Sequence, residues 1–472
     1  MTEKILKKIT PEKIENFYQG NIYPVIICLT VLFGSLSGLE VYFYFPFVIM
    51  SAGALILCKS IKPFLISLLT IYMQISVKNS PFYPARSDYL FTGWRIYAAA
   101  SLTVILVASI IFFVIRNKIY KRISIESTPL LIPALILSVA FLLNGAFSSG
   151  WSFSGLAFGG ANVLVYLFLF LLIYHGFSEN DTPCKLIKYF SYISALIAVV
   201  ISAELIHLFL TNENIISGGT INKTEVALGW GIWNLIGVSL AVLIPVIFYG
   251  MTVGKYPFLY FAAATLAFVM SVLTMSRNAL IFSTLIYAVC VLIFCFKGKF
   301  KKQFRIITAV GIVAVILFAV LFWDKIQTLL SDYFERGFSD NGRFDIWRAA
   351  FANFVKSPIF GSGFYSLSVE NFYSFGPVPL MAHNTILELL SAMGLFGLLA
   401  YICYAAAICR PIFCRPTLMK TMLALSLATL MAESMLDNFV FNFYPMFYFS
   451  AAAAIIFKAD SEKCPDTRNS QT

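Results

Sequence analysis

The sequence predicts an all-α polytopic integral membrane protein, a bundle of about 12–14 transmembrane helices with a large outer loop before the last three. Of its 472 residues, 60% are hydrophobic and 12% are charged, and no soluble domain could bury so much apolar surface. The apolar residues form runs of about 17–25, the length that crosses roughly 30 Å of hydrocarbon as a helix. Unpaired backbone groups are costly in lipid and the alternation of a membrane barrel is absent, so helical spans are expected.

Fourteen apolar segments are predicted to be membrane helices. They are residues 22–38, 41–58, 61–77, 96–115, 128–146, 161–177, 188–210, 227–250, 256–274, 278–296, 305–323, 384–409, 418–436 and 440–457. Residues 1–21 form a basic cytosolic lead-in without a cleavable signal peptide. Residues 22–323 hold helices 1–11, residues 324–383 the large outer loop with an amphipathic helix, and residues 384–457 helices 12–14. Residues 458–472 form a polar cytosolic tail.

Charge predicts the orientation, because Lys and Arg are retained on the cytoplasmic side. With both termini inside, most of the 34 Lys and Arg residues fall in inner segments, including "RNKIYKR" (116–122) and "KGKFKKQFR" (297–305). The net charge of +11 is explained by topology and contact with membrane lipids, with no need for nucleic acid. The nine cysteines fall in spans or inner segments, so no disulfide framework is expected, and their spacing lacks a zinc signature.

The outer loop of residues 324–383 is too long to be a mere connection. Within it, "SDNGRFDIWRAAFANFVKSPIFGSGF" (339–364) reads as a helix. Asp340 or Asn341 is expected to cap this helix, and Pro358 with the neighbouring glycines is expected to end it.

The helix in this loop carries an arginine on its apolar side. At 100° per residue, Arg343 shares a face with Trp347, whereas Arg348 lies on the opposite side. A helix on a membrane surface normally turns its arginines toward water, so Arg343 suggests a bound anion. The alternatives are snorkelling, or a salt bridge to Asp345 or Glu335.

A second arginine lies in "TMSRNALIF" (274–282), between two apolar runs with almost no loop. Arg277 is therefore expected at an outer hairpin, at or just below the membrane interface, where a charge is costly and usually functional. Ser276 and the first N–H groups of the next helix would add donors for an anion. The alternative is an ordinary interfacial anchor.

His383 begins the span after the large loop, on the same outer side as Arg277 and Arg343. An imidazole can accept a proton from a hydroxyl near neutral pH, although a lone histidine at a helix end is more often a cap or an interface residue. Two cations and one base on a common face describe a site that holds a pyrophosphate and deprotonates an alcohol.

Three strings, "SRNA" (276–279), "GRFDIWRAAFANFVKSPIFGSGF" (342–364) and "AHNTILELLSAMGLFG" (382–397), resemble the O-antigen ligase and O-antigen polymerase superfamily. Their order, spacing and outer placement carry the resemblance, which covers roughly residues 225–410. It implies a GT-C-type, metal-independent, inverting membrane glycosyltransferase without a cofactor, acting in surface polysaccharide biosynthesis.

The resemblance also implies the substrates and the compartment. The donor would be a glycan on undecaprenyl pyrophosphate at the outer face of the bacterial cytoplasmic membrane, and the acceptor a hydroxyl of a glycan, a lipid or a cell-wall molecule. Whether the enzyme is a ligase or a repeat-unit polymerase stays open, because both use the same donor chemistry.

The family's catalytic residues match three positions of this chain. Arg277 and Arg343 would neutralise the departing pyrophosphate, and His383 would activate the acceptor hydroxyl. Four further residues are expected to bind substrate: Ser276, Trp347, Asn384 and Glu388.

Two positions depart from the family pattern. Asn278 stands where glycine is frequent, which bears on close approach of the backbone to phosphate. Ala392 stands where an acidic residue often precedes the glycine at 394, and Glu388 is the candidate to take over that residue's role in orienting His383.

Some features remain outside this site. Glu433 and Asp437 approach the outer boundary and are candidates to orient an arginine or bind sugar hydroxyls. The segment "WSFSGLAFGGAN" (151–162) is predicted to be an outer loop that packs against a glycan. The main alternative function is a polysaccharide transporter or flippase without chemistry, which would carry ionisable residues near mid-membrane and broken helices, whereas the charges here gather at one face.

Overall fold

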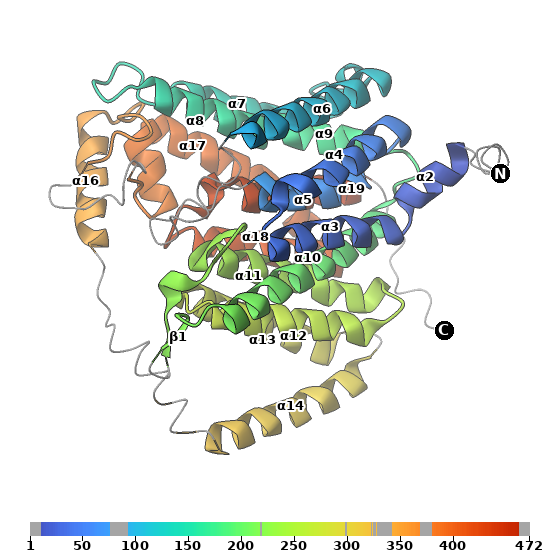
Figure 1. Cartoon of the computed structure of the whole chain (residues 1–472). Coiled ribbons are helices and arrows are strands. Elements are labelled where there is room, and N and C mark those ends of the chain that lie inside the picture. The colour runs from blue at the N-terminus through green and yellow to red at the C-terminus, as the bar shows by residue number, and fades with distance from the viewer. Residues whose placement is uncertain are drawn as a thin grey trace.

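The computed structural model describes residues 11–75, 93–217, 220–297, 300–321, 323, 327, 342–368 and 380–461. The helices are α2 (Pro11–Gln19), α3 (Ile22–Ser37), α4 (Glu40–Leu57), α5 (Phe64–Ile75), α6 (Trp94–Arg116), η1 (Ile119–Lys121), α7 (Leu131–Leu142), α8 (Phe153–Val163), η2 (Leu164–Leu169), α9 (Phe170–Gly176), α10 (Pro183–Thr211), η3 (Lys223–Glu225), α11 (Trp233–Val253), α12 (Pro257–Leu273), α13 (Arg277–Phe296), α14 (Lys301–Leu321), α16 (Arg343–Lys356), α17 (Thr385–Cys414), α18 (Leu418–Glu433), η4 (Phe439–Phe441) and α19 (Phe443–Ser461). Two antiparallel pairs of two-residue strands complete the list: β1 (Ile216–Ser217) with β2 (Thr220–Ile221), and β3 (Ala227–Leu228) with β4 (Gly231–Ile232). The predicted all-α polytopic fold is confirmed (Figure 1).

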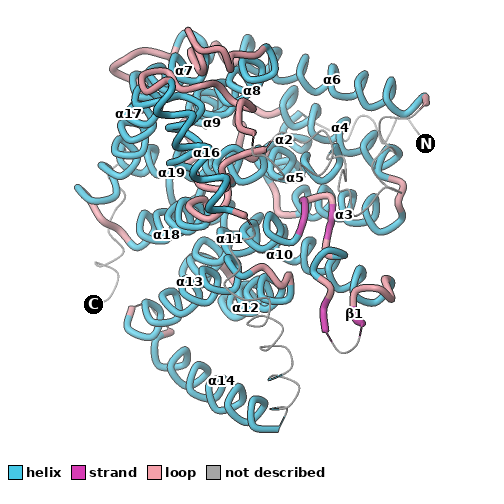
Figure 2. The backbone as a smooth tube through the Cα atoms, turned by 90° about the vertical axis from the view of Figure 1, so that its left-hand side faces the viewer, coloured by secondary structure: helices cyan, strands magenta, loops and turns pink. Residues whose placement is uncertain are grey.

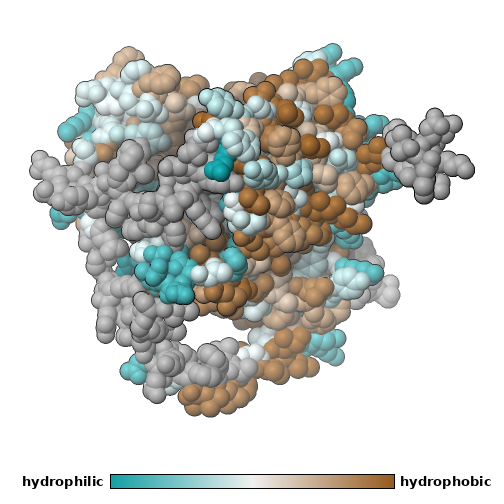
Figure 3. All heavy atoms as spheres, in the orientation of Figure 1, coloured by the Kyte–Doolittle hydropathy of each residue, from teal (hydrophilic) through white to brown (hydrophobic). Residues whose placement is uncertain are grey.

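Seven helical stretches in the described part of the chain are long and apolar enough to cross a membrane. They are α4, α6, the continuous stretch of residues 153–176, α10, α11, α13 and α17. The count reaches eight if α2 and α3, which meet at 61°, form one broken span, and shorter apolar helices lie at residues 64–73, 131–142 and 257–273. Every predicted span overlaps a helix, while the number of membrane crossings stays a prediction. Large apolar side chains cover much of the molecular surface (Figure 3), as lipid contact requires.

Helix α11 is the centre of the bundle, and 83% of its most apolar 18-residue stretch is buried. It packs against α10, α12, α13 and α18. The approach to α13 is close at Gly237, where a Cβ would lie 2.4 Å from the Cβ of Ala279. A side chain at 237 would therefore push α13 away, so this glycine sets the spacing that brings the N-terminal ends of the two helices together.

Several predicted boundaries differ from the structure. The supposed loop at 151–162 is largely helical, because the hydroxyl of Ser152 accepts the Gly155 N–H at 3.0 Å and starts α8 at Phe153. Residues 227–232, expected to begin a span, form the β3–β4 hairpin, so α11 starts later. The last helix continues beyond 457 to Ser461.

Helices α2 and α16 lie at opposite ends of the bundle (Figure 1). Figure 2 looks onto the α16 end, where α16 crosses in front of the membrane helices. The same end holds the N-termini of α13 and α17, as their contacts with α11, α16 and the turn after α18 require. This end is where the predicted functional residues meet.

Candidate functional site

His383 is the last residue before α17, and its backbone and flanking peptide are tightly held. Its φ is +49°, a left-handed conformation that is uncommon outside glycine and is often found at functional sites. The N–H of the preceding Ala382 donates to Glu388 Oε2 at 2.6 Å, and its carbonyl accepts the Trp347 indole N–H at 2.9 Å. Asn384 caps the helix by accepting the Leu387 N–H at 3.0 Å. The position of the imidazole is thus fixed from both sides.

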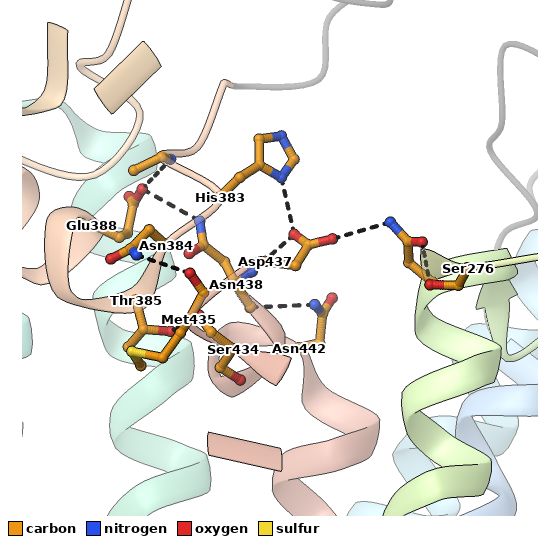
Figure 4. A network of polar contacts seen from close by, with 12 residues as sticks. Ser276, His383, Asn384, Thr385, Glu388, Ser434, Met435, Asp437, Asn438 and Asn442 are labelled. Carbon is orange, nitrogen blue, oxygen red and sulfur yellow. Dashed lines mark hydrogen bonds and ion pairs between the residues drawn. The ribbon is translucent and has the colours of Figure 1, made fainter. Parts of the chain in front are cut away.

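The imidazole of His383 is paired with a carboxylate that comes from the turn after α18. Nδ1 of His383 lies 3.0 Å from Oδ1 of Asp437. The other ring nitrogen points away from this carboxylate (Figure 4), and the histidine side chain is 40% exposed. The carboxylate therefore holds the ring while Nε2 stays reachable from outside the protein.

The turn that carries Asp437 is joined to the start of α17. Ser434 O accepts both the N–H and the hydroxyl of Thr385, at 3.1 and 2.8 Å, and Met435 O accepts Nδ2 of Asn384 at 2.8 Å. These contacts, seen in Figure 4, lock the turn to the histidine's helix. The distance between imidazole and carboxylate therefore does not depend on a flexible loop.

Burial alone would raise the pKa of the Asp437 carboxyl, but the hydrogen bond and the charge of His383 outweigh it. The Asn438 N–H, which donates to Oδ1 at 2.8 Å, and the positive charge of Arg343 act in the same direction. The pKa of Asp437 is therefore lowered, and the carboxylate is charged at neutral pH.

Ser276, the residue before Arg277, is linked to this centre by hydrogen bonds. The hydroxyl of Ser276 donates to Asn234 Oδ1 at 2.8 Å, and Nδ2 of Asn234 lies 3.4 Å from Asp437 Oδ2. Ser276 also caps α13 by accepting the Ala279 N–H at 3.4 Å, so half-buried Arg277 is the first residue of that helix. A continuous chain of polar contacts thus runs from the predicted Ser-Arg hairpin to His383.

Arg343 is the first residue of α16, and it is half-buried on the side that faces the bundle. The buried residues of this helix are Ile346 and Ala350, which confirms the predicted apolar face. Arg348 is exposed and forms an ion pair with Asp345 at 3.2 Å, so one of the two predicted alternative partners of Arg343 is paired with another arginine. The other, Glu335, lies outside the described residues. The predicted caps Asp340 and Asn341 also lie outside them, and Gly342 holds the N-cap position.

Helix α16 is docked on α17 through the "PIFGSGF" segment (358–364) that follows it. Gly394 interrupts α17 with φ +65° and ψ −161°, and the freed peptide groups pair with this segment. The Ser362 and Gly363 N–H groups donate to Ser391 O and Ala392 O at 2.7 and 3.0 Å, and Leu395 N–H donates to Pro358 O at 2.8 Å. A Cβ on Gly394 would lie 2.4 Å from the Ile359 carbonyl oxygen, so only glycine fits.

Sequence reasoning missed that Asp437 is the partner of His383. Glu388, the residue expected to orient the imidazole, instead binds the Ala382 backbone. Ser276, Trp347, Asn384 and Glu388 all make hydrogen bonds within the protein, so their visible role is to position the site, and their contact with substrate stays a prediction. The signal for Asp437 was an acidic residue at the same outer boundary as the histidine, 54 residues further along the chain.

The fold and the arrangement of these polar residues define a class of protein. A polytopic helical membrane protein gathers at one end two arginines and a partly open imidazole backed by a carboxylate. Such a site suits binding of an anionic group and removal of a proton from a hydroxyl.

Comparison with known families agrees with this class. Residues 261–402 match a family model described as O-antigen ligase, which confirms the resemblance stated above. The matched segment contains Arg277, Arg343 and His383. Asn234 and Asp437, which complete the polar chain, come from outside it. No curated protein matches the sequence.

Proposed function

We propose that the protein transfers a glycan from undecaprenyl pyrophosphate to an acceptor hydroxyl at the outer face of the bacterial cytoplasmic membrane. The match to the O-antigen ligase family supports a glycosyltransferase-type enzyme with lipid-linked glycan substrates. The observation that carries the proposal is the meeting of His383 and Asp437 at 3.0 Å with the charge of Arg343 acting on the same carboxylate. Ser276, the residue before Arg277, is joined to this pair through Asn234.

The proposed reaction is a single displacement. Nε2 of His383 removes the proton from the acceptor hydroxyl as its oxygen forms a bond to the anomeric carbon, and the bond from that carbon to the pyrophosphate oxygen breaks. Attack from the face opposite the leaving group inverts the anomeric configuration. Arg277 and Arg343 balance the charge that develops on the departing pyrophosphate, which is already a good leaving group.

Asp437 has two roles in this mechanism. It keeps the proton of the neutral imidazole on Nδ1, so that the lone pair of Nε2 is free to act as the base. It then stabilises the imidazolium that forms, because its carboxylate remains charged. No step in this scheme requires a metal ion or a cofactor.

An in vitro assay with purified protein and a lipid-linked oligosaccharide tests the proposal. We expect transfer by the wild type with and without a chelator, loss of transfer in His383→Ala, and nearly full transfer in Arg348→Ala, whose side chain is exposed. Folded His383→Ala protein with wild-type turnover would show that the base is assigned wrongly. Offering a second lipid-linked repeat unit or a different lipid acceptor distinguishes a polymerase from a ligase, and flipping without transfer would favour the transporter.

A further inference from the structure

Glu433 is a buried acid four residues before Asp437 in the chain. It is the last residue of α18, its side chain is 0% exposed, and neither carboxyl oxygen has a hydrogen-bond partner within the described residues. An isolated carboxylate in such surroundings would be strongly destabilising, whereas the neutral acid is much less so. A fully buried acid without a partner needs an explanation, and function is a frequent one.

The backbone places Glu433 next to the residues that hold His383. Its carbonyl accepts the N–H groups of Leu436 and Asp437 at 3.0 and 3.1 Å, which folds the chain back over the end of α18. The Asp437 carboxylate is close enough for its charge to act on Glu433. If Glu433 were also ionised, two like charges would stand side by side behind one imidazole.

Asn438 is a hub with one unused acceptor. Its N–H donates to Asp437 at 2.8 Å, and its Nδ2 lies 3.5 Å from Glu388 Oε2. It therefore links the carboxylate on the imidazole with the carboxylate on the Ala382 peptide (Figure 4). Its own Oδ1 is buried and has no donor among the residues described. A hydrogen-bond donor directed at Oδ1 would hold the side-chain amide in the orientation that its link to Glu388 needs.

We propose that Glu433 is a positioning residue that stays in its acid form and donates its O–H, through one ordered buried water, to Oδ1 of Asn438. The water accepts from the acid and donates to the amide, so each group gains a partner that it lacks within the described protein. This fixes the Asn438 side-chain amide, and through it the Glu388 carboxylate that holds the Ala382 peptide next to His383. The catalytic consequence rests on the proposed function, whereas the protonation of Glu433 does not.

Infrared spectroscopy tests the protonation without any activity measurement. The carbonyl stretch of a protonated carboxyl should be present in the wild type at neutral pH and should be lost in the difference spectrum with Glu433→Gln. Absence of that band would overturn the proposal.

Kinetics tests the positioning role. Glu433→Gln keeps a neutral donor and should retain kcat within about twofold, whereas Glu433→Leu should lower kcat about tenfold, the effect of about one hydrogen bond, with the donor KM unchanged. In an Asn438→Ala background, Glu433→Leu should have no further effect, because the acceptor is already gone. Full activity of Glu433→Leu, equal loss in both Glu433 variants, or additive losses in the double variant would each overturn the role. A wild type that transfers no glycan would instead overturn the proposed function.

Discussion

Replacing Asp437 by asparagine removes the charge that backs His383 while keeping the shape of the side chain. With about 4 Å between the charge centres and an effective dielectric constant of about 20, the attraction between carboxylate and imidazolium is about 4 kcal/mol. The histidine side chain is 40% exposed, so water screens part of this energy and we take about 2 kcal/mol. At 1.36 kcal/mol for each factor of ten, kcat/KM should fall about 30-fold.

The assay is the initial rate of glycan transfer at neutral pH over a range of donor concentrations. We expect the loss in kcat and little change in the donor KM, because the carboxylate acts on the imidazolium that forms in the transition state. Asp345→Asn is the matched control, since it makes the same change in an exposed pair with Arg348. Wild-type kcat/KM in Asp437→Asn, with an unchanged Tm in detergent, would refute the assignment of Asp437 as the partner of the base.

Three further outcomes follow from the structure. Gly394→Ala should destabilise the protein by about 2–4 kcal/mol, because alanine is strained at φ +65° and its Cβ would clash with the Ile359 carbonyl oxygen. Thermal unfolding of this variant should show a large drop in Tm. The control Gly311→Ala should show little change, because a Cβ there meets nothing within 4 Å. Trp347→Phe removes the 2.9 Å hydrogen bond to the Ala382 carbonyl, which contributes about 1 kcal/mol. Initial-rate assays should therefore give a kcat several-fold lower than that of the wild type. An unaltered kcat would mean that this hydrogen bond does not position His383. Because folding lowers the pKa of Asp437, the contribution of this carboxylate to stability is fully present above the ordinary aspartate pKa of about 4 and disappears as the pH falls through the lowered pKa. The Tm difference between wild type and Asp437→Asn should therefore shrink over that acidic range. A constant Tm difference would contradict a lowered pKa of Asp437.

Most of the helical architecture was predictable, because long apolar runs are a direct consequence of the thickness of the bilayer. The errors have local causes. Residues 153–162 combine small and apolar residues without charge, so their hydropathy resembles that of a glycine-rich loop, and only the cap at Ser152 reveals the helix. Residues 227–232 are apolar enough to pass for the start of a span, although Gly229 and Gly231 permit the turn of a hairpin.

The candidate site was predictable in part. Arg277, Arg343 and His383 stood out because each is a polar exception at the edge of an apolar segment. The partner of His383 did not, since the contact between α17 and the turn after α18 depends on packing between distant segments. Glu388 was the nearer acid in sequence, but its carboxylate turns to the Ala382 N–H. Local spacing therefore identified the reactive groups, and only tertiary structure identified what holds them.

The way α16 is attached has a consequence for how such a protein diversifies. The position of α16 against α17 is set by contacts of residues 343–364. These are the hydrogen bond of the Trp347 indole and the hydrogen bonds to the backbone groups left unpaired by the break at Gly394. All of these described tethers lie on the C-terminal side of Gly342. Insertions before Gly342 would leave them in place and keep the position of the arginine at the start of α16, so recognition surfaces and reaction chemistry are able to evolve at separate rates.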